Sequence, residues 1–254
     1  MNTRDDQLCI KQPQRPSRIA DWEGVVSRRN ATCIIYTNIM AAASTVTFSK
    51  FIEGKIRMWF KMYNLKHDGG MGMEDFDLLA DVFVKEFKPT AALEADLKHW
   101  LQNCWSIIIS EGKEVAKAGK PGGITADNCP ALIEIETILN SHQRMTEDQY
   151  VKAFGQLVEV NKDLFVKNFT RMVTMFFTLF DTDSDGFMTV DDMIRGFRCF
   201  GIEQEEATRA IFGDLDKNKT GKLSRDVYIA EWVEFMVGED KDAVLAKYLC
   251  QGQS

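Results

Sequence analysis

One stretch of twelve residues decides the fold of this chain: Asp181-Thr182-Asp183-Ser184-Asp185-Gly186-Phe187-Met188-Thr189-Val190-Asp191-Asp192. Oxygen-bearing side chains stand at positions 1, 3, 5, 9 and 12 of the stretch, with glycine at position 6 and an apolar residue at position 8. Calcium takes about six to eight oxygen ligands, which a short loop supplies only by curling around the ion. The predicted ligands are the carboxylates of Asp181, Asp183, Asp185 and Asp192, the Phe187 carbonyl, and the Thr189 hydroxyl or a water that it holds.

The residues on both sides of this loop separate it from an ordinary acidic turn, where Asp, Ser and Gly are also common. Apolar residues recur at helical spacing before and after it, which predicts an amphipathic helix on each side. Helix, twelve-residue loop and helix together form an EF-hand. The residues of the two apolar faces are Phe165, Phe169, Met172, Val173, Phe176, Phe177 and Phe180 before the loop, and Met193, Ile194, Phe197 and Phe200 after it.

A partner loop follows at 216–227, with Leu223 at position 8 lying 35 residues after Met188. Its predicted ligands are Asp216, Asn218, Thr220, the carbonyl of Lys222, and Ser224. Val227 stands at position 12 in place of a carboxylate, and Asp226 is one residue out of register. Lys217, Lys219 and Lys222 add repulsion. We expect this loop to complete the pair with weak or no metal binding.

A first hand is predicted upstream, where an aromatic-rich helix over residues 48–63 precedes a loop at 64–75. Gly69, Met71 and Asp75 keep positions 6, 8 and 12 of the motif, and Asn64, Asp68 and Asp75 are its candidate ligands. However, Lys66 places a cation at position 3 and Gly72 has no side chain at position 9. We therefore expect a degenerate hand.

The second hand is the most eroded of the four. With Met145 at position 8, its ligand positions carry no carboxylate; they are Ile138, Asn140, His142, Thr146 and Gln149. A competing register uses Gly122 and Ile124 but begins at Lys117, which cannot bind a cation either. The glycine- and proline-containing stretch over about 117–140 is predicted to be an insertion between hands, with a short helix in 130–140.

The chain resembles the invertebrate sarcoplasmic calcium-binding proteins, a family that includes calexcitin and the luciferin-binding proteins and photoproteins. The resemblance lies in the aromatic first helix (Phe51 to Tyr63) and in the C-terminal loops at 180–186 and 212–224, and it extends over roughly 46–254. It implies an all-α, two-lobed fold of four helix-loop-helix units in two pairs, several of them degenerate. Val227, Lys66 and the insertion depart from the family pattern.

Composition agrees with this organisation. A net charge of −7 is typical of a cation-binding chain and not of a nucleic-acid-binding one, and 45% apolar residues suffice for a sizeable core. We expect three segments: an extension at 1–45, disordered or dispensable, with Met40 as an alternative start; an N-terminal pair at 46–160; and a C-terminal pair at 161–254. The uncharged run 30–49 is too polar for a signal or membrane span. Six scattered cysteines predict free thiols and a cytoplasmic location.

Three functions remain open at this point, and none is catalytic, because no triad, phosphate-binding loop or zinc motif is present. The first is a cytosolic calcium buffer. The second is a sensor whose groove, lined by Met172, Met175, Phe176 and Met193, opens to a partner helix. The third is a calcium-gated carrier of a small apolar ligand held by aromatic side chains, with Trp59, Trp100, Trp105 and Trp232 as candidates. Asp192 is one methylene shorter than the usual Glu, so we expect Mg²⁺ to compete with Ca²⁺.

Overall fold

The computed structural model describes residues 49–250. The predicted extension at 1–45 and the alternative start at Met40 lie outside the described residues. None of the helices in the described part is both long and apolar enough to cross a membrane.

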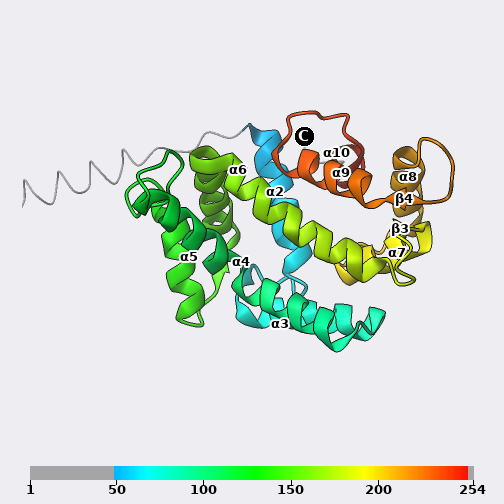
Figure 1. Ribbon diagram of the computed structural model, residues 1–254, viewed down its shortest axis with the longest axis horizontal. Helices are drawn as coiled ribbons and strands as arrows, with labels where there is room; N and C mark the ends of the chain where they lie inside the picture. Colours follow the sequence, from blue (N-terminus) through cyan, green and yellow to red (C-terminus); the bar gives the residue numbers. More distant parts are fainter. Residues whose placement is uncertain (1–48, 251–254) are drawn as a thin grey trace, which may run out of the picture. The chain divides into compact units, whose positions relative to one another are not determined.

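The described chain is all-α, as predicted, and its strands are only two residues long (Figure 1). The helices are α2 (Lys50–Tyr63), α3 (Met73–Phe87), α4 (Ala91–Lys117), α5 (Pro130–Asn140), α6 (Glu147–Phe180), α7 (Val190–Cys199), α8 (Glu205–Leu215), α9 (Arg225–Val237) and α10 (Val244–Leu249). The strands are β1 (Gly70–Met71), β2 (Met145–Thr146), β3 (Phe187–Met188) and β4 (Leu223–Ser224).

The strands join the hands in two pairs. β1 pairs antiparallel with β2, with Met71 opposite Met145, and β3 pairs with β4, with Met188 opposite Leu223. All four of these residues are the position-8 residues of their loops, and their side chains are fully buried. The Met145 register of the second hand is therefore confirmed, and the competing register through Gly122 and Ile124 is wrong.

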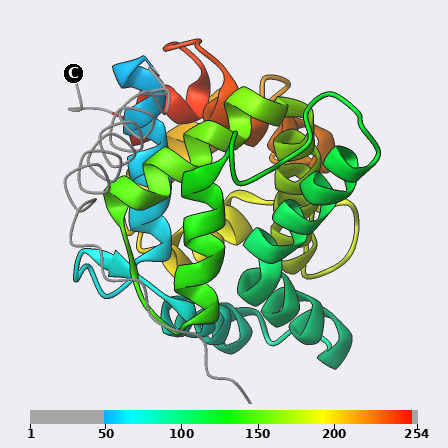
Figure 2. The ribbon, with the colours of Figure 1, turned by 90° about the vertical axis from the view of Figure 1, so that its left-hand side faces the viewer.

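The predicted insertion is shorter than 117–140. Lys117 is the last residue of α4, and only 118–129 connects two helices without regular structure. α5 leads directly into β2, so residues 130–140 are the entering helix of the second hand. In Figure 2, α4, α5 and α6 run next to one another, and each of these helices contacts the other two.

α6 serves two hands at once. Its first part leaves the second loop and its last part enters the third, and the backbone breaks between them at Asn161 (φ −153°, ψ 78°). The Asn161 side chain accepts from the amide of Leu164 at 2.8 Å, which caps the second part, and donates to the carbonyl of Gly122 at 2.8 Å. The connection 118–129 is thereby held against the kink.

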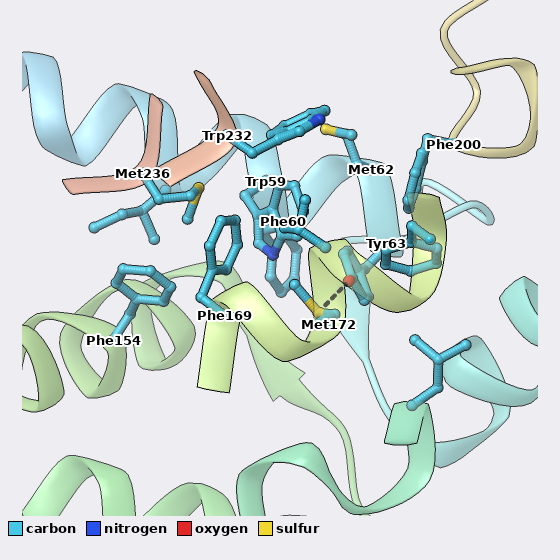
Figure 3. Close-up of a cluster of buried hydrophobic side chains, with 14 of the residues drawn as sticks. Trp59, Phe60, Met62, Tyr63, Phe154, Phe169, Met172, Phe200, Trp232 and Met236 are labelled. Atoms are coloured by element: carbon cyan, nitrogen blue, oxygen red, sulfur yellow. Dashed lines mark hydrogen bonds between the residues drawn. The ribbon is translucent and has the colours of Figure 1, made fainter. Parts of the chain in front are cut away.

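Aromatic side chains from both pairs meet in one core (Figure 3). Trp59 of α2 lies 5.4 Å from Phe169 of α6 and 5.3 Å from Trp232 of α9, measured between ring centroids. Phe83 of α3 lies 5.1 Å from Phe176. Each such pair contributes about 0.5–1.5 kcal/mol beyond its buried area. The two pairs of hands therefore stabilise each other through a shared core.

Candidate metal sites

The third loop gathers three carboxylates at one point. One oxygen each from Asp181, Asp183 and Asp185 lie within 4.8 Å of one another. The loop's own amides hold this arrangement: Asp181 accepts from the amides of Asp185 at 3.1 Å and Gly186 at 2.9 Å, and Asp185 accepts from that of Phe187 at 2.9 Å. Such a cluster of oxygen ligands suits a hard divalent cation.

Three of the four loops share the same backbone turn. Positions 4 and 6 have positive φ in each, a conformation that glycine adopts without strain and other residues seldom do. The second loop lacks this turn, since α5 continues through Asn140 and only His142 there has positive φ. The shared angles are 53° and 83° at His67 and Gly69, 57° and 84° at Ser184 and Gly186, and 54° and 73° at Lys219 and Gly221.

Asp192 does not join the cluster. Its Oδ2 atom accepts from the Thr189 hydroxyl at 2.6 Å and from the Thr189 amide at 3.1 Å, and Thr189 accepts from the Asp192 amide. The two residues thus form a capping box at the start of α7. Phe187 lies in β3 opposite Ser224. Of the predicted ligand side chains, those at positions 1, 3 and 5 are brought together, whereas those at positions 9 and 12 bond to each other.

A lysine from the fourth loop reaches into this site. The Lys222 ammonium lies 2.5 Å from Asp185 Oδ2 and 5.4 Å from the centre of the Phe187 ring. The hydrogen bond from Lys222 lowers the pKa of Asp185, while burial raises the pKa of Asp181. Lys222, predicted to add repulsion in its own loop, thus places its ammonium beside a carboxylate of the third loop.

The fourth loop satisfies its only ligand carboxylate internally. Asp216 accepts from the Thr220 amide at 3.0 Å, the Thr220 hydroxyl at 3.0 Å and the Gly221 amide at 2.6 Å, and the Thr220 amide is the main cause of its lowered pKa. The Lys222 carbonyl accepts from Thr220, Asn218 is exposed, and Ser224 caps α9. Val227, at position 12, is 42% exposed. Weak or absent metal binding by this loop stays a prediction.

The first loop contains an arginine that the sequence analysis missed. Arg144, from the second loop, donates to Asp68 at 2.6 Å, to the Gly70 carbonyl at 2.6 Å and to Glu74, and its guanidinium lies 3.2 Å from Asp75. Lys66, the cation predicted at position 3, lies 3.8 Å from Asp75. The oxygens Asn64 Oδ1 and Asp75 Oδ1 are buried and make no hydrogen bond with the described residues. The sequence did carry a sign of this contact, because the second and fourth loops both have a basic residue at position 7, Arg144 and Lys222.

An aromatic cavity lies beside the shared core. It has a volume of about 50 Å³, room for a few water-sized molecules. Trp59, Trp100 and Trp105 line it, whereas Trp232 does not. The indole N–H of Trp100 is buried and has no hydrogen-bond partner in the described part. The other lining residues are Tyr63, Phe76, Cys104, Ile108, Tyr150, Phe154, Leu157, Phe165, Asn168, Phe169 and Met172.

Comparison with known proteins supports the assignment of the third and fourth loops as an EF-hand pair. The family model of the EF-hand domain pair matches residues 169–232, which hold the third and fourth loops. The chain is an EF-hand protein. A sarcoplasmic calcium-binding protein of Mizuhopecten yessoensis is 21% identical over 192 residues, covering 75% of this chain and 92% of the relative. The EF-hand calcium-binding domain-containing protein 11 of Homo sapiens is 27% identical over 96 residues, or 37% and 58% of the two chains.

Solved structures show the same fold for this EF-hand protein. The calcium-loaded apo coelenterazine-binding protein from Renilla muelleri matches with a TM-score of 0.51 and 16% identity, over 80% of this chain and 98% of that one. The photoprotein clytin matches with a TM-score of 0.53 and 14% identity, over 81% and 97%. The predicted resemblance to sarcoplasmic calcium-binding and luciferin-binding proteins is confirmed.

Proposed function

We propose that this EF-hand protein binds one calcium ion in the loop 181–192, in the cytosol, and acts as a calcium buffer. The observation that carries the proposal is the cluster of Asp181, Asp183 and Asp185 within a loop that has the EF-hand backbone. Asp192 completes the ligand set by leaving its bond to Thr189 and turning toward the ion. Because a short Asp arm favours one coordinating oxygen, we include Mg²⁺ as a competing ion.

Burial of the predicted sensor groove supports a buffer over a sensor. Met172, Phe176 and Met193 are at most 7% exposed, and Met175 is half-buried. The aromatic side chain of Phe83, from the first hand's exit helix, packs on this face, and Arg195 of α7 donates to Glu86 of α3 at 2.8 Å. A partner helix would have to displace the N-terminal pair to reach these residues.

A dye that fluoresces on exposed apolar surface separates the two roles. A buffer should give nearly the same fluorescence in calcium and in chelator. A large calcium-dependent increase, abolished by Asp181→Ala, would favour the sensor and overturn the buffer.

The second candidate is a calcium-gated carrier of a small apolar ligand. The aromatic cavity and the unpartnered Trp100 N–H favour it, because ligand sites combine apolar walls with a few placed polar groups. At about 50 Å³ the cavity must expand to take a ligand of drug size, which needs about 300 Å³ or more. Phe169 and Met172 of α6 line the cavity, and Asp181 caps the C-terminal end of the same helix. Calcium binding at Asp181 can therefore change the cavity by moving α6. Absorbance of the protein purified from its source would reveal a bound chromophore.

No catalytic role is part of this proposal. His67 lies in the first loop and His142 in the second, and His99 lies on α4 with its ring nitrogen 3.4 Å from the Asn103 side chain. None of the three joins a carboxylate cluster within the described residues. Incubation with generic esterase and phosphatase substrates should give no turnover above buffer.

A further inference from the structure

The two basic residues that reach into a neighbouring loop occupy the same place in their hands. Arg144 stands directly before β2 and Lys222 directly before β4, each at position 7 of its loop. Antiparallel pairing of the strands brings each residue against the partner loop. Both side chains contact the carboxylate at position 5 of that loop, Asp68 in one pair and Asp185 in the other.

Arg144 contacts what an ion in the first loop would contact. Besides Asp68 at position 5, it binds the carbonyl of Gly70 at position 7 and lies beside Asp75 at position 12. Asp75 is fully buried, and a buried carboxylate is strongly destabilising without a cation close by. Arg144, at 3.2 Å, is the nearer of the two cations beside Asp75, and Lys66 lies at 3.8 Å.

Two glycines of the first loop make room for this arginine. A Cβ at Gly72, where a position-9 ligand would stand, would lie 3.2 Å from Cγ of Arg144 and 2.8 Å from the Glu74 carboxylate. A Cβ at Gly70 would lie 3.2 Å from Nε of Arg144. The loss of a ligand side chain and the presence of the guanidinium are thus two parts of one arrangement.

Lys222 makes a weaker version of the same contact. Among the residues that the structure describes, its ammonium pairs with one carboxylate, and its side chain is 50% exposed, against 31% for Arg144. Arg binds several oxygens in a fixed fork, whereas Lys acts as a single mobile charge. An entering divalent ion can therefore displace Lys222 but not Arg144.

We propose that the position-7 residue of each even-numbered hand is an internal cation for the odd-numbered loop of its pair. Arg144 replaces the metal ion in the first loop, and Lys222 competes with the metal ion for Asp185 in the third. The Lys222 part rests on the proposed function of the third loop. The Arg144 part does not.

Calcium titration by calorimetry tests the Lys222 part. Lys222→Gln should bind calcium about tenfold more tightly than the original protein, since a nearby positive charge is removed from the path of a doubly charged ion. The difference should shrink at high salt, because exposed charges are screened. Lys222→Arg keeps the charge and adds further donors, so it should bind calcium no more tightly than the original protein.

The matched control is Lys217→Gln, which removes the same charge from the same loop. Within the described residues Lys217 pairs with no carboxylate, so its affinity change should be much smaller. Equal affinities for Lys222→Gln and Lys217→Gln would overturn the Lys222 part. If the original protein binds no calcium at all, the proposed function itself fails.

Thermal unfolding in an Asp181→Ala background, with the third loop disabled, tests the Arg144 part. Asp181→Ala alone should melt at the same temperature in chelator and in millimolar calcium. Adding Arg144→Gln should lower the melting temperature in chelator, and calcium should raise it again by taking the vacated position. Should the double variant be unfolded in chelator, calcium should refold it. A calcium stabilisation of the double variant no larger than that of Asp181→Ala alone would overturn this part.

Discussion

The first and third loops have the same backbone but take their positive charge from different sources. Each turns through positive φ at positions 4 and 6 and carries an aspartate at position 5. In the first loop that aspartate binds Arg144, together with Glu74 and the buried Asp75. In the third loop the basic side chain that pairs with this aspartate, within the described residues, is Lys222, and two further aspartates lie beside it.

The difference teaches that a hand can keep the EF-hand backbone turn while an arginine lies among its carboxylates. Asp75 still accepts from the amide of Gly72 at the start of α3, at 2.9 Å, just as Asp192 bonds to Thr189 at the start of α7. A guanidinium balances the carboxylates of the first loop permanently. The third loop, with a single displaceable lysine, stays open to an ion from solution.

Removal of a ligand from the third loop should have the largest effect. Asp181→Ala deletes the carboxylate that accepts from two loop amides, and calcium affinity should fall by about 100-fold or more, since even outer partners of metal ligands are worth about 10–100-fold. Calorimetry measures the change. Asp216→Ala, at the same position of the fourth loop, is the control and should leave the dominant site nearly unchanged. A loss of similar size in the control would break the distinction between the two loops.

The packing of the exit helices also differs between the two hands. A Cβ at Gly196 of α7 would lie 2.4 Å from the Phe180 ring, whereas the corresponding position in the first hand holds the buried Leu79. Gly196→Ala should therefore lower the free energy of unfolding by about 1–3 kcal/mol. Gly213→Ala, on α8 with no atom within 4 Å of the added Cβ, should instead raise it by about 0.5–1 kcal/mol. Denaturant unfolding of both variants measures this, and a stabilised Gly196→Ala would show that α7 is free to move away from Phe180.

The length of the position-12 side chain should set ion preference in the third loop. Asp192→Glu adds the methylene that lets both carboxylate oxygens reach the ion, so the ratio of calcium to magnesium affinity should rise about tenfold. Titration with each ion measures the ratio. An unchanged ratio would mean that Asp192 does not coordinate the ion and acts only as the cap of α7.

The smallest effect is expected from repair of the fourth loop. Val227→Glu restores a carboxylate at position 12 beside the single charged ligand Asp216, and a second calcium site with a dissociation constant on the order of 10⁻⁴–10⁻³ M should appear. Val227→Gln is the uncharged control. A tight second site would show that Val227 alone prevents calcium binding by this loop.

Local patterns predicted most of this architecture. The twelve-residue spacing located the third and fourth loops, and Met188 and Leu223 at position 8 pair as the motif requires. The cation at Lys66 was also foreseen from its position in the first loop. These features depend on residues close together in the sequence, which is why spacing alone reveals them.

Features that depend on contacts between loops were not predicted. Arg144 lies 76 residues from Asp68, and its match to Lys222 at position 7 was the sequence signal for this contact. α4 is held by an ion cluster in which Glu111 binds Arg171 at 2.9 Å and Lys167 at 3.1 Å on α6. Asp192 caps α7 through Thr189, and the ligand spacing does not distinguish this use of a position-12 carboxylate from ion binding.

The amide NMR signals of three matched glycines test most directly whether calcium enters the third loop and leaves the first loop to Arg144. Gly69, Gly186 and Gly221 all stand at position 6 with positive φ, and Gly186 donates to Asp181 at 2.9 Å. In a two-dimensional NMR titration with calcium, the Gly186 amide should shift and saturate at one equivalent, while the Gly69 amide stays in place because Arg144 already fills its loop. A shift of Gly69 that parallels that of Gly186 would contradict the account.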